Sequence, residues 1–146
     1  MMCLATPFAG ADTDIPRDDS LLVPDWNMWT CHERRVLYKD LMTSICDIPG
    51  KRTIPGFVVW FEKDTEPVVV AWGYDTSLPT YEARWKNAHA ALHLSDGRWI
   101  IGKKFMVTWA NNGRTYTISL LDDADVEIAG MTFIFGSEKK LFKSRS

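Results

Sequence analysis

Hydrophobic and polar residues alternate most clearly over residues 104–121, where two alternating runs flank Asn112 and Gly113. This arrangement predicts a β-hairpin, because a type I′ turn needs positive φ at both central residues and Asn-Gly tolerates it best. The large apolar residues then share one face: Phe105, Val107, Trp109, Tyr116, Ile118 and Leu120. The other face is rich in hydroxyls: Met106, Thr108, Ala110, Thr115, Thr117 and Ser119. We expect the apolar face to be buried and the hydroxyl face to meet solvent or a partner.

Two segments have the hydrophobic spacing of a helix. In the first, Thr30 and Glu33 form a capping box, the following apolar residues recur at helical spacing, and Pro49 ends the segment, which predicts a helix over 30–48. In the second, Thr80 can cap and the apolar spacing continues toward Leu94, which predicts a helix over 80–94.

A second hairpin is predicted from residues 57–62 and 67–74, which are apolar on both faces and flank a polar turn. A two-residue turn would place one set of side chains on the same face: Phe57, Val59, Phe61, Val68, Val70 and Trp72. A short strand over 99–101 and further strands after residue 121 complete the order α-β-β-α-β-β-β-β.

The fold class predicted from these elements is α+β. We expect a single compact domain, in which two helices pack on a mostly antiparallel sheet built from two hairpins and C-terminal strands. The length of 146 residues suits one domain. The predicted organisation is an extended acidic arm over 1–25, the α+β domain over 26–136 and a basic C-terminal tail over 137–146.

Composition adds limits on location and partners. Lys and Arg total 17 against 19 Asp and Glu, so no overall basic field attracts nucleic acid or an anionic membrane. No segment reaches the length of a membrane span. The three cysteines are an odd count without a CxxC pair, which fits neither a disulfide framework nor a zinc ribbon and favours a reducing, cytoplasmic setting.

Two clusters have the residue types of a metal site. His89 and His93 would lie one turn apart on the predicted second helix, although the glutamate of a zinc-protease motif is missing. Asp123, Asp125 and Glu127 alternate, so on a strand their carboxylates would point the same way and suit Mg²⁺. Ordinary surface roles explain both patterns more simply, so no metal or other cofactor is expected and a small metal-dependent enzyme stays a further alternative.

Aromatic and basic residues point instead to binding. Seven Trp exceed what one small core obviously requires, so part of them is expected at an interface. Arg98, Lys103, Lys104 and Arg114 surround Trp99, which makes nucleic acid the alternative partner. The predicted partner-binding residues are Trp60, Trp99, Lys103, Lys104, Met106 and Arg114.

With no motif for a nucleophile, a phosphate loop or a dinucleotide fold in the sequence, we do not expect an enzyme. The hypothesis is a small protein-interaction module, a regulator or inhibitor of a larger assembly, compatible with a phage-type or other viral accessory factor. The oligomeric state and the identity of the partner stay open.

Overall fold

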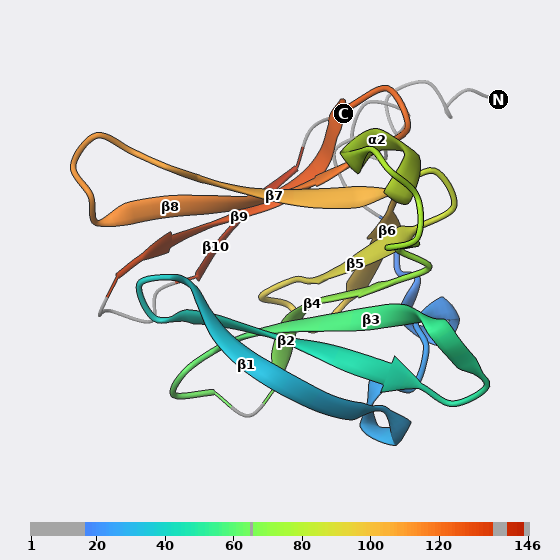
Figure 1. Cartoon of the computed structure of the whole chain (residues 1–146). Coiled ribbons are helices and arrows are strands. Elements are labelled where there is room, and N and C mark those ends of the chain that lie inside the picture. The colour runs from blue at the N-terminus through green and yellow to red at the C-terminus, as the bar shows by residue number, and fades with distance from the viewer. Residues whose placement is uncertain (1–16, 65, 136–139, 145–146) are drawn as a thin grey trace, which may run out of the picture.

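The computed structural model describes residues 17–64, 66–135 and 140–144 (Figure 1). Most of this part of the chain is β-strand. The strands are β1 (Thr30–Tyr38), β2 (Leu41–Ile48), β3 (Lys51–Phe61), β4 (Pro67–Trp72), β5 (His89–His93), β6 (Trp99–Gly102), β7 (Lys104–Trp109), β8 (Thr115–Leu121), β9 (Glu127–Ile134) and β10 (Lys140–Ser144). Among the described residues, helical structure is limited to the 3-10 turns η1 (Ser20–Leu22) and η2 (Trp26–Met28) and the short helix α2 (Tyr81–Arg84).

The strands form two antiparallel sheets with up-and-down connections. One sheet has six strands in the order β1-β2-β3-β4-β5-β6, and the other has four in the order β10-β9-β8-β7. Only Lys103 separates β6 from β7, so the chain passes directly from one sheet to the other there. The two sheets lie face to face and come closest near that crossing (Figure 1).

The main core fills the space between the sheets, and a smaller one covers the outer face of the six-stranded sheet. The main core includes Leu41, Val59, Phe61, Leu92, Tyr116, Ile118, Leu120, Met131 and Phe133. The outer cluster contains Trp29, Cys46, Val70, Ala91 and Trp99. Residues 17–29 cover part of this outer face, because the Asp19 amide donates to the Trp99 carbonyl at 2.7 Å and the Asp19 carboxylate accepts from the Ile101 amide at 3.0 Å.

The predicted α+β fold class is wrong, because neither long helix exists. Residues 30–48 form the β1–β2 hairpin, in which Tyr38 pairs with Leu41 across a turn where Lys39 has φ 51°. Glu33 has φ 55° at an irregularity of the strand pairing, so it belongs to no capping box. Cross-strand pairing and burial of β2 outweigh the helical spacing of the apolar residues.

The second predicted helix is reduced to α2, which ends at Arg84 with Trp85 as its C-cap, and residues 89–93 form β5 instead. Its predicted start is confirmed, since the Thr80 hydroxyl accepts from the Ala83 amide at 3.1 Å. The buried Ala90, Ala91 and Leu92 lie on β5 between β4 and β6, and they pack into the clusters on both faces of the sheet. Burial on both faces of this interior strand therefore decides the conformation of the segment.

The register of the hairpin over residues 104–121 is confirmed. Trp109 pairs with Tyr116, and the other predicted pairs follow along β7 and β8. The turn differs from the predicted type I′: the Ala110 amide bonds to Thr115 at 2.8 Å, and of Asn112 and Gly113 only Gly113 has positive φ, at 70°. The loop is therefore four residues long, and the Asn112 side chain accepts from the Thr115 amide at 3.0 Å.

The register of the β3–β4 hairpin is shifted by one residue from the prediction. Val59 pairs with Val69 rather than Val70. A shift of one residue exchanges the two faces of a strand. Val69 therefore faces the main core, whereas Val70 and Trp72 face outward, which corrects the predicted set of side chains sharing a face.

A disulfide joins Cys31 and Cys46, which are directly opposed in β1 and β2. The expectation that the cysteines form no disulfide is therefore wrong. The two residues are 15 positions apart in sequence, and only the hairpin brings them together.

The division into arm, domain and tail stays a prediction. Residues 1–16, 136–139 and 145–146 lie outside the described residues, while residues 140–144 form β10 alongside β9. Within the described ranges, no helix has the length and apolar character needed to cross a membrane.

Candidate functional site: an aromatic surface at one end of the sheets

Aromatic side chains from both sheets meet at the β1–β2 turn. Figure 1 shows this turn rising toward the four-stranded sheet. The rings of Tyr38 and Trp109 stack with their centroids 4.4 Å apart and an interplanar angle of 6°. The Lys39 ammonium lies 5.7 Å from the centroid of the Tyr38 ring and 5.3 Å from that of the Phe135 ring. The Phe135 amide donates to the Arg114 carbonyl at 2.7 Å, which brings Arg114 to the same end. We call these five residues the aromatic end surface.

A hydrogen bond between the sheets holds this surface in place. The Tyr116 hydroxyl donates to the Asp40 carboxylate at 2.6 Å, and Tyr116 is only 1% exposed. Burial, followed by the bond to Asp40 and its charge, raises the pKa of Tyr116 far above its usual range. The phenol therefore keeps its proton and remains a donor to the turn that carries Tyr38 and Lys39.

The aromatic end surface is open to solvent although it is rigidly supported. Trp109 is 57% exposed and Phe135 is 41% exposed, and Lys39 and Arg114 are exposed beside them. Large aromatic rings and Arg are the residues that dominate binding energy at protein interfaces. Because Tyr38 already stacks on Trp109, a partner would lose little side-chain entropy in contacting the indole.

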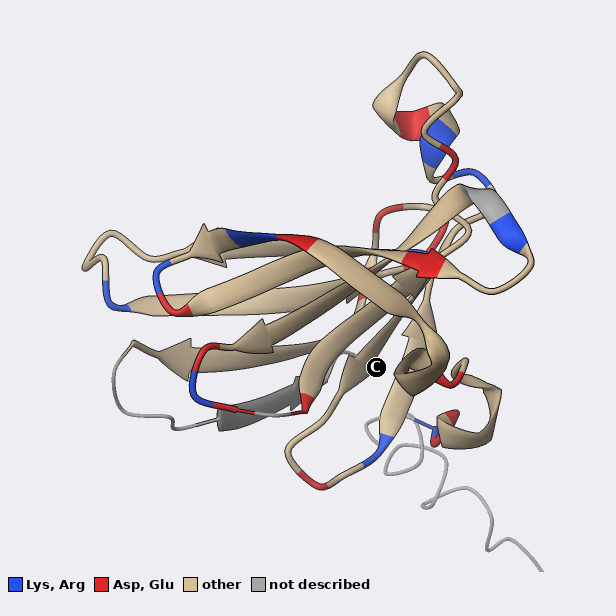
Figure 2. Cartoon of the chain, turned by 60° about the horizontal axis from the view of Figure 1, so that its bottom comes forward, with Lys and Arg blue, Asp and Glu red and all other residues tan. Residues whose placement is uncertain are grey.

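Three predicted partner-binding residues have internal contacts. Trp99 is 6% exposed and stacks on His93 with ring centroids 4.4 Å apart. Lys103 approaches Asp123 with 3.9 Å between Nζ and Oδ1, and Lys104 forms an ion pair with the Asp125 carboxylate. Figure 2 shows that charged residues lie mostly in turns and near strand ends. The two lysines of the basic rim that was predicted around Trp99, Lys103 and Lys104, are thus paired with acidic side chains.

The other three predicted partner-binding residues are separated. Trp60 lies on the outer side of the six-stranded sheet, where the Arg34 guanidinium is 5.7 Å from its ring centroid. Met106 is 45% exposed on the outer side of the four-stranded sheet. Of this set, Arg114 alone lies at the aromatic end surface. The six residues therefore do not share one surface.

The two candidate histidines are not brought together. Both lie on β5, where a separation of four residues corresponds to about 13 Å rather than one helical turn. His89 stacks on Trp72 with centroids 5.5 Å apart, and the His93 Nδ1 is 3.2 Å from the Pro67 carbonyl oxygen. Each imidazole thus has its own packing partner at one end of the strand.

The three candidate carboxylates also diverge. Asp123 and Asp125 lie in the β8–β9 turn beside Lys103 and Lys104, whereas Glu127 begins β9 and accepts from the Ser119 hydroxyl at 2.5 Å. Among residues 17–64, 66–135 and 140–144, no group of three or more His, Cys, Asp or Glu side chains is placed to hold a metal ion.

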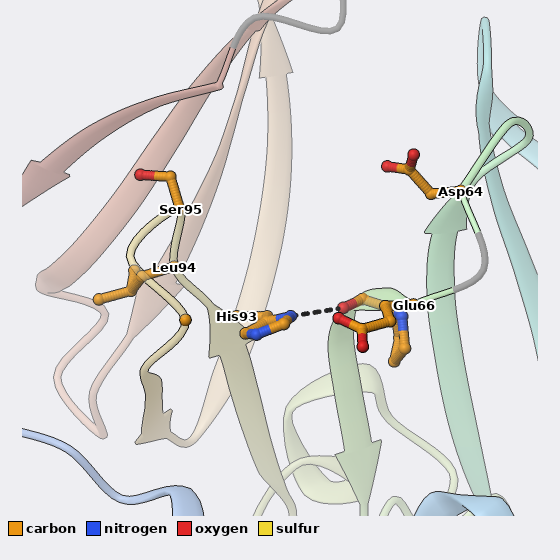
Figure 3. A pocket seen from close by; sticks show the side chains of 7 residues that line it. Asp64, Glu66, His93, Leu94 and Ser95 are labelled. Carbon is orange, nitrogen blue, oxygen red and sulfur yellow. Dashed lines mark hydrogen bonds between the residues drawn. The ribbon is translucent and has the colours of Figure 1, made fainter.

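A polar pocket of about 470 Å³ lies between the β3–β4 and β5–β6 turns. Its lining includes Asp64, Glu66, His93 and Ser95. Figure 3 shows His93 directed at the backbone beside Glu66, while the Ser95 side chain points away from it. The residues drawn there form no pair of nucleophile and base, so this pocket has the residue types of a catalytic site without the geometry.

The sequence pattern missed most of the aromatic end surface. Trp109 was assigned to the buried face, and Tyr38 and Lys39 were assigned to a helix. The available signal was the position of Trp109, which is the last residue of its strand before the polar loop. A large ring at that position lies at the rim of the sheet, where the core ends.

The chain matches no family model, no curated protein and no solved structure in comparisons with known proteins.

Proposed function

We propose that this protein is a non-enzymatic binding module, a regulator or inhibitor that contacts a partner protein through the aromatic end surface. The observation that carries the proposal is the Trp109 indole, which is 57% exposed and stacked on Tyr38 at 4.4 Å. An exposed Trp that is fixed before binding is the kind of residue that contributes most to affinity.

The charges around the indole indicate the chemistry of the partner. Lys39 and Arg114 are exposed at this surface. A partner segment that presents an aromatic or aliphatic side chain flanked by carboxylates would satisfy both the rings and the cations. We therefore expect an acidic, partly apolar segment of a protein as the ligand.

The alternatives have less support from the geometry. Nucleic-acid binding through the basic rim would need free positive charge, whereas Lys103 and Lys104 lie beside Asp123 and Asp125. A metal-dependent enzyme would need converging ligands, and the candidate side chains have separate partners.

The cytoplasmic location expected from the cysteine count remains a prediction. The disulfide between Cys31 and Cys46 weighs against it, because disulfides persist mainly in oxidising compartments. We expect a partner that shares such a compartment.

The proposal is tested by comparing two exposed aromatic positions. Immobilised wild-type protein, Trp109→Ser and the control Tyr81→Ser are incubated with extract of the source cells, and bound proteins are quantified by mass spectrometry. Tyr81 is 55% exposed and lies on α2, so Tyr81→Ser removes an aromatic ring of similar exposure at a different place on the surface. We expect a stoichiometric partner that Trp109→Ser loses, by about thirtyfold in affinity, and that Tyr81→Ser keeps.

A circular dichroism spectrum identical to wild type establishes that Trp109→Ser is folded. A partner that binds the folded Trp109→Ser variant as tightly as wild type contradicts the proposal. Binding that falls equally in both variants also contradicts it.

A further inference from the structure

A second recognition feature lies at the opposite end of β2 from the aromatic end surface. It is a pocket of about 450 Å³ whose lining includes Trp29, Ile48, Ile54 and Trp72. The pocket opens on the outer face of the six-stranded sheet, because Ile48 and Trp72 pack against the outer cluster. Ligand pockets in proteins have volumes of about 300 to 1,000 Å³ and mostly apolar walls.

Part of the wall is the indole of Trp29, which occupies the space that a side chain at Gly56 would need. Trp29 is 9% exposed and lies directly over Gly56 of β3. A Cβ atom at residue 56 would be 2.8 Å from Cε3 of Trp29, closer than any side chain permits. The absence of a side chain at Gly56 therefore lets the indole approach the β3 backbone closely.

A second part of the wall is built from β4 and β5. Trp72 and His89 are cross-strand partners, and their rings stack with an interplanar angle of 14°. The pKa of His89 is lowered, mainly by burial and further by Lys103, while the Asp123 carboxylate opposes the shift. The imidazole is therefore neutral near pH 7, so this wall carries a polar but uncharged ring.

Two further polar residues, Lys51 and Asn87, line the pocket. Lys51, the first residue of β3, is exposed and supplies an ammonium group. Asn87 lies opposite, held close to Gly73, where φ of 80° turns the chain after β4. Among the described residues that line the pocket there is no Asp or Glu, so none of them neutralises Lys51.

We propose that this pocket binds a small planar aromatic carboxylate. The flat ring system would lie against the indoles of Trp29 and Trp72, which both line the pocket, and the carboxylate would pair with the Lys51 ammonium at the rim. Stacking favours a planar ligand over a saturated one of equal size. The cationic rim selects an anionic group, and the limited volume selects a small molecule rather than a folded partner.

The test uses 2-naphthoate as the probe and the full chain with ¹⁵N-labelled indoles. We expect saturable shifts of the Trp29 and Trp72 indole resonances with a dissociation constant of about 1 mM or lower. The neutral 2-naphthol should bind about two- to fivefold more weakly, which is the effect of losing one exposed ion pair. Cyclohexanecarboxylate should bind more weakly than 2-naphthoate because it cannot stack.

Substitutions in and outside the pocket show where 2-naphthoate binds. Trp72→Leu should weaken 2-naphthoate binding about tenfold, and Lys51→Gln should weaken it about two- to fivefold without changing the binding of 2-naphthol. Trp109→Leu and Lys63→Gln are the matched controls, since Trp109 lies at the aromatic end surface and Lys63 is an exposed residue of the β3–β4 turn. Both controls should bind 2-naphthoate as wild type does.

Three results would overturn the proposal. The first is the absence of saturable indole shifts at 5 mM probe, and the second is a loss of binding in Trp109→Leu with none in folded Trp72→Leu. The third is tighter binding of N-acetyl-tryptophanamide than of 2-naphthoate, which would identify the occupant as an aromatic side chain of a protein.

Discussion

The hydrogen bond from Tyr116 to Asp40 joins β8 to the β1–β2 turn, and we expect its loss to destabilise the protein measurably. Tyr116→Phe removes one hydroxyl and keeps the ring that contacts Tyr38 and Phe61. The donor is 1% exposed, the distance is 2.6 Å and the acceptor is a carboxylate, a class of bond worth about 1.5–3 kcal/mol. Asp40 is only half-buried and regains water in the variant, so we expect the lower end, about 1.5 kcal/mol.

The assay is urea unfolding followed by far-ultraviolet circular dichroism, as a double-mutant cycle with Asp40→Ala. We expect Tyr116→Phe to lower the transition midpoint without changing the slope. In the Asp40→Ala background, the same substitution should cost less than about 0.5 kcal/mol, because the acceptor is already gone. Equal losses in the two backgrounds would refute the assignment of this energy to the hydrogen bond.

The same hydrogen bond predicts that the free energy of unfolding depends on pH in the alkaline range. The pKa of Tyr116 is raised in the folded chain, so above about pH 10 the unfolded chain has lost a proton that the folded chain still holds. The free energy of unfolding of the wild type should therefore be unaffected by this group below pH 10. Above that pH it should fall, by at most about 1.4 kcal/mol per pH unit. Tyr116→Phe should lack this component, so a wild-type minus variant difference that stays constant from pH 9 to 11 would contradict the reasoning.

Two further predictions concern the six-stranded sheet. Gly56→Ala should destabilise the protein by about 1–3 kcal/mol in urea unfolding, because the new methyl group overlaps the Trp29 ring. The loss should nearly vanish in a Trp29→Ala background, and a persistent loss would place the cause elsewhere. Cys31→Ser should cost about 3 kcal/mol, the value for a disulfide closing about 15 residues. Dithiothreitol should destabilise the wild type by a similar amount and leave this variant unchanged, whereas a wild type insensitive to dithiothreitol would argue against the bond.

The hairpin over residues 104–121 was predictable because its signals are local. Alternation of apolar residues, with Asn112 and Gly113 at the turn, sets the register within one short segment. Tyr116, Ile118 and Leu120 are buried as predicted. The turn itself differs in conformation, since a four-residue loop satisfies the same register with positive φ at Gly113 alone.

The β1–β2 hairpin was not predictable from the same kind of signal. Its turn contains Lys39 with φ 51° followed by Asp40, and neither Gly, Asn nor Pro marks it. Without a visible turn, the apolar residues between Thr30 and Ile48 fit helical spacing. The competing energy comes from pairing of β2 with β3, which lies outside the segment that shows the helical spacing.

The sequence by itself determined the Asn-Gly hairpin, the absence of a basic field and the cap at Thr80. The tertiary structure decided which aromatic rings are exposed. Trp99 is buried because residues 17–29 cover it, and Trp109 is exposed because the core ends where the β1–β2 turn meets β7. The exposure of each Trp ring depends on how the two sheets and the segment over residues 17–29 pack against one another. That packing consists of contacts between residues far apart in the sequence, and no local sequence pattern encodes it.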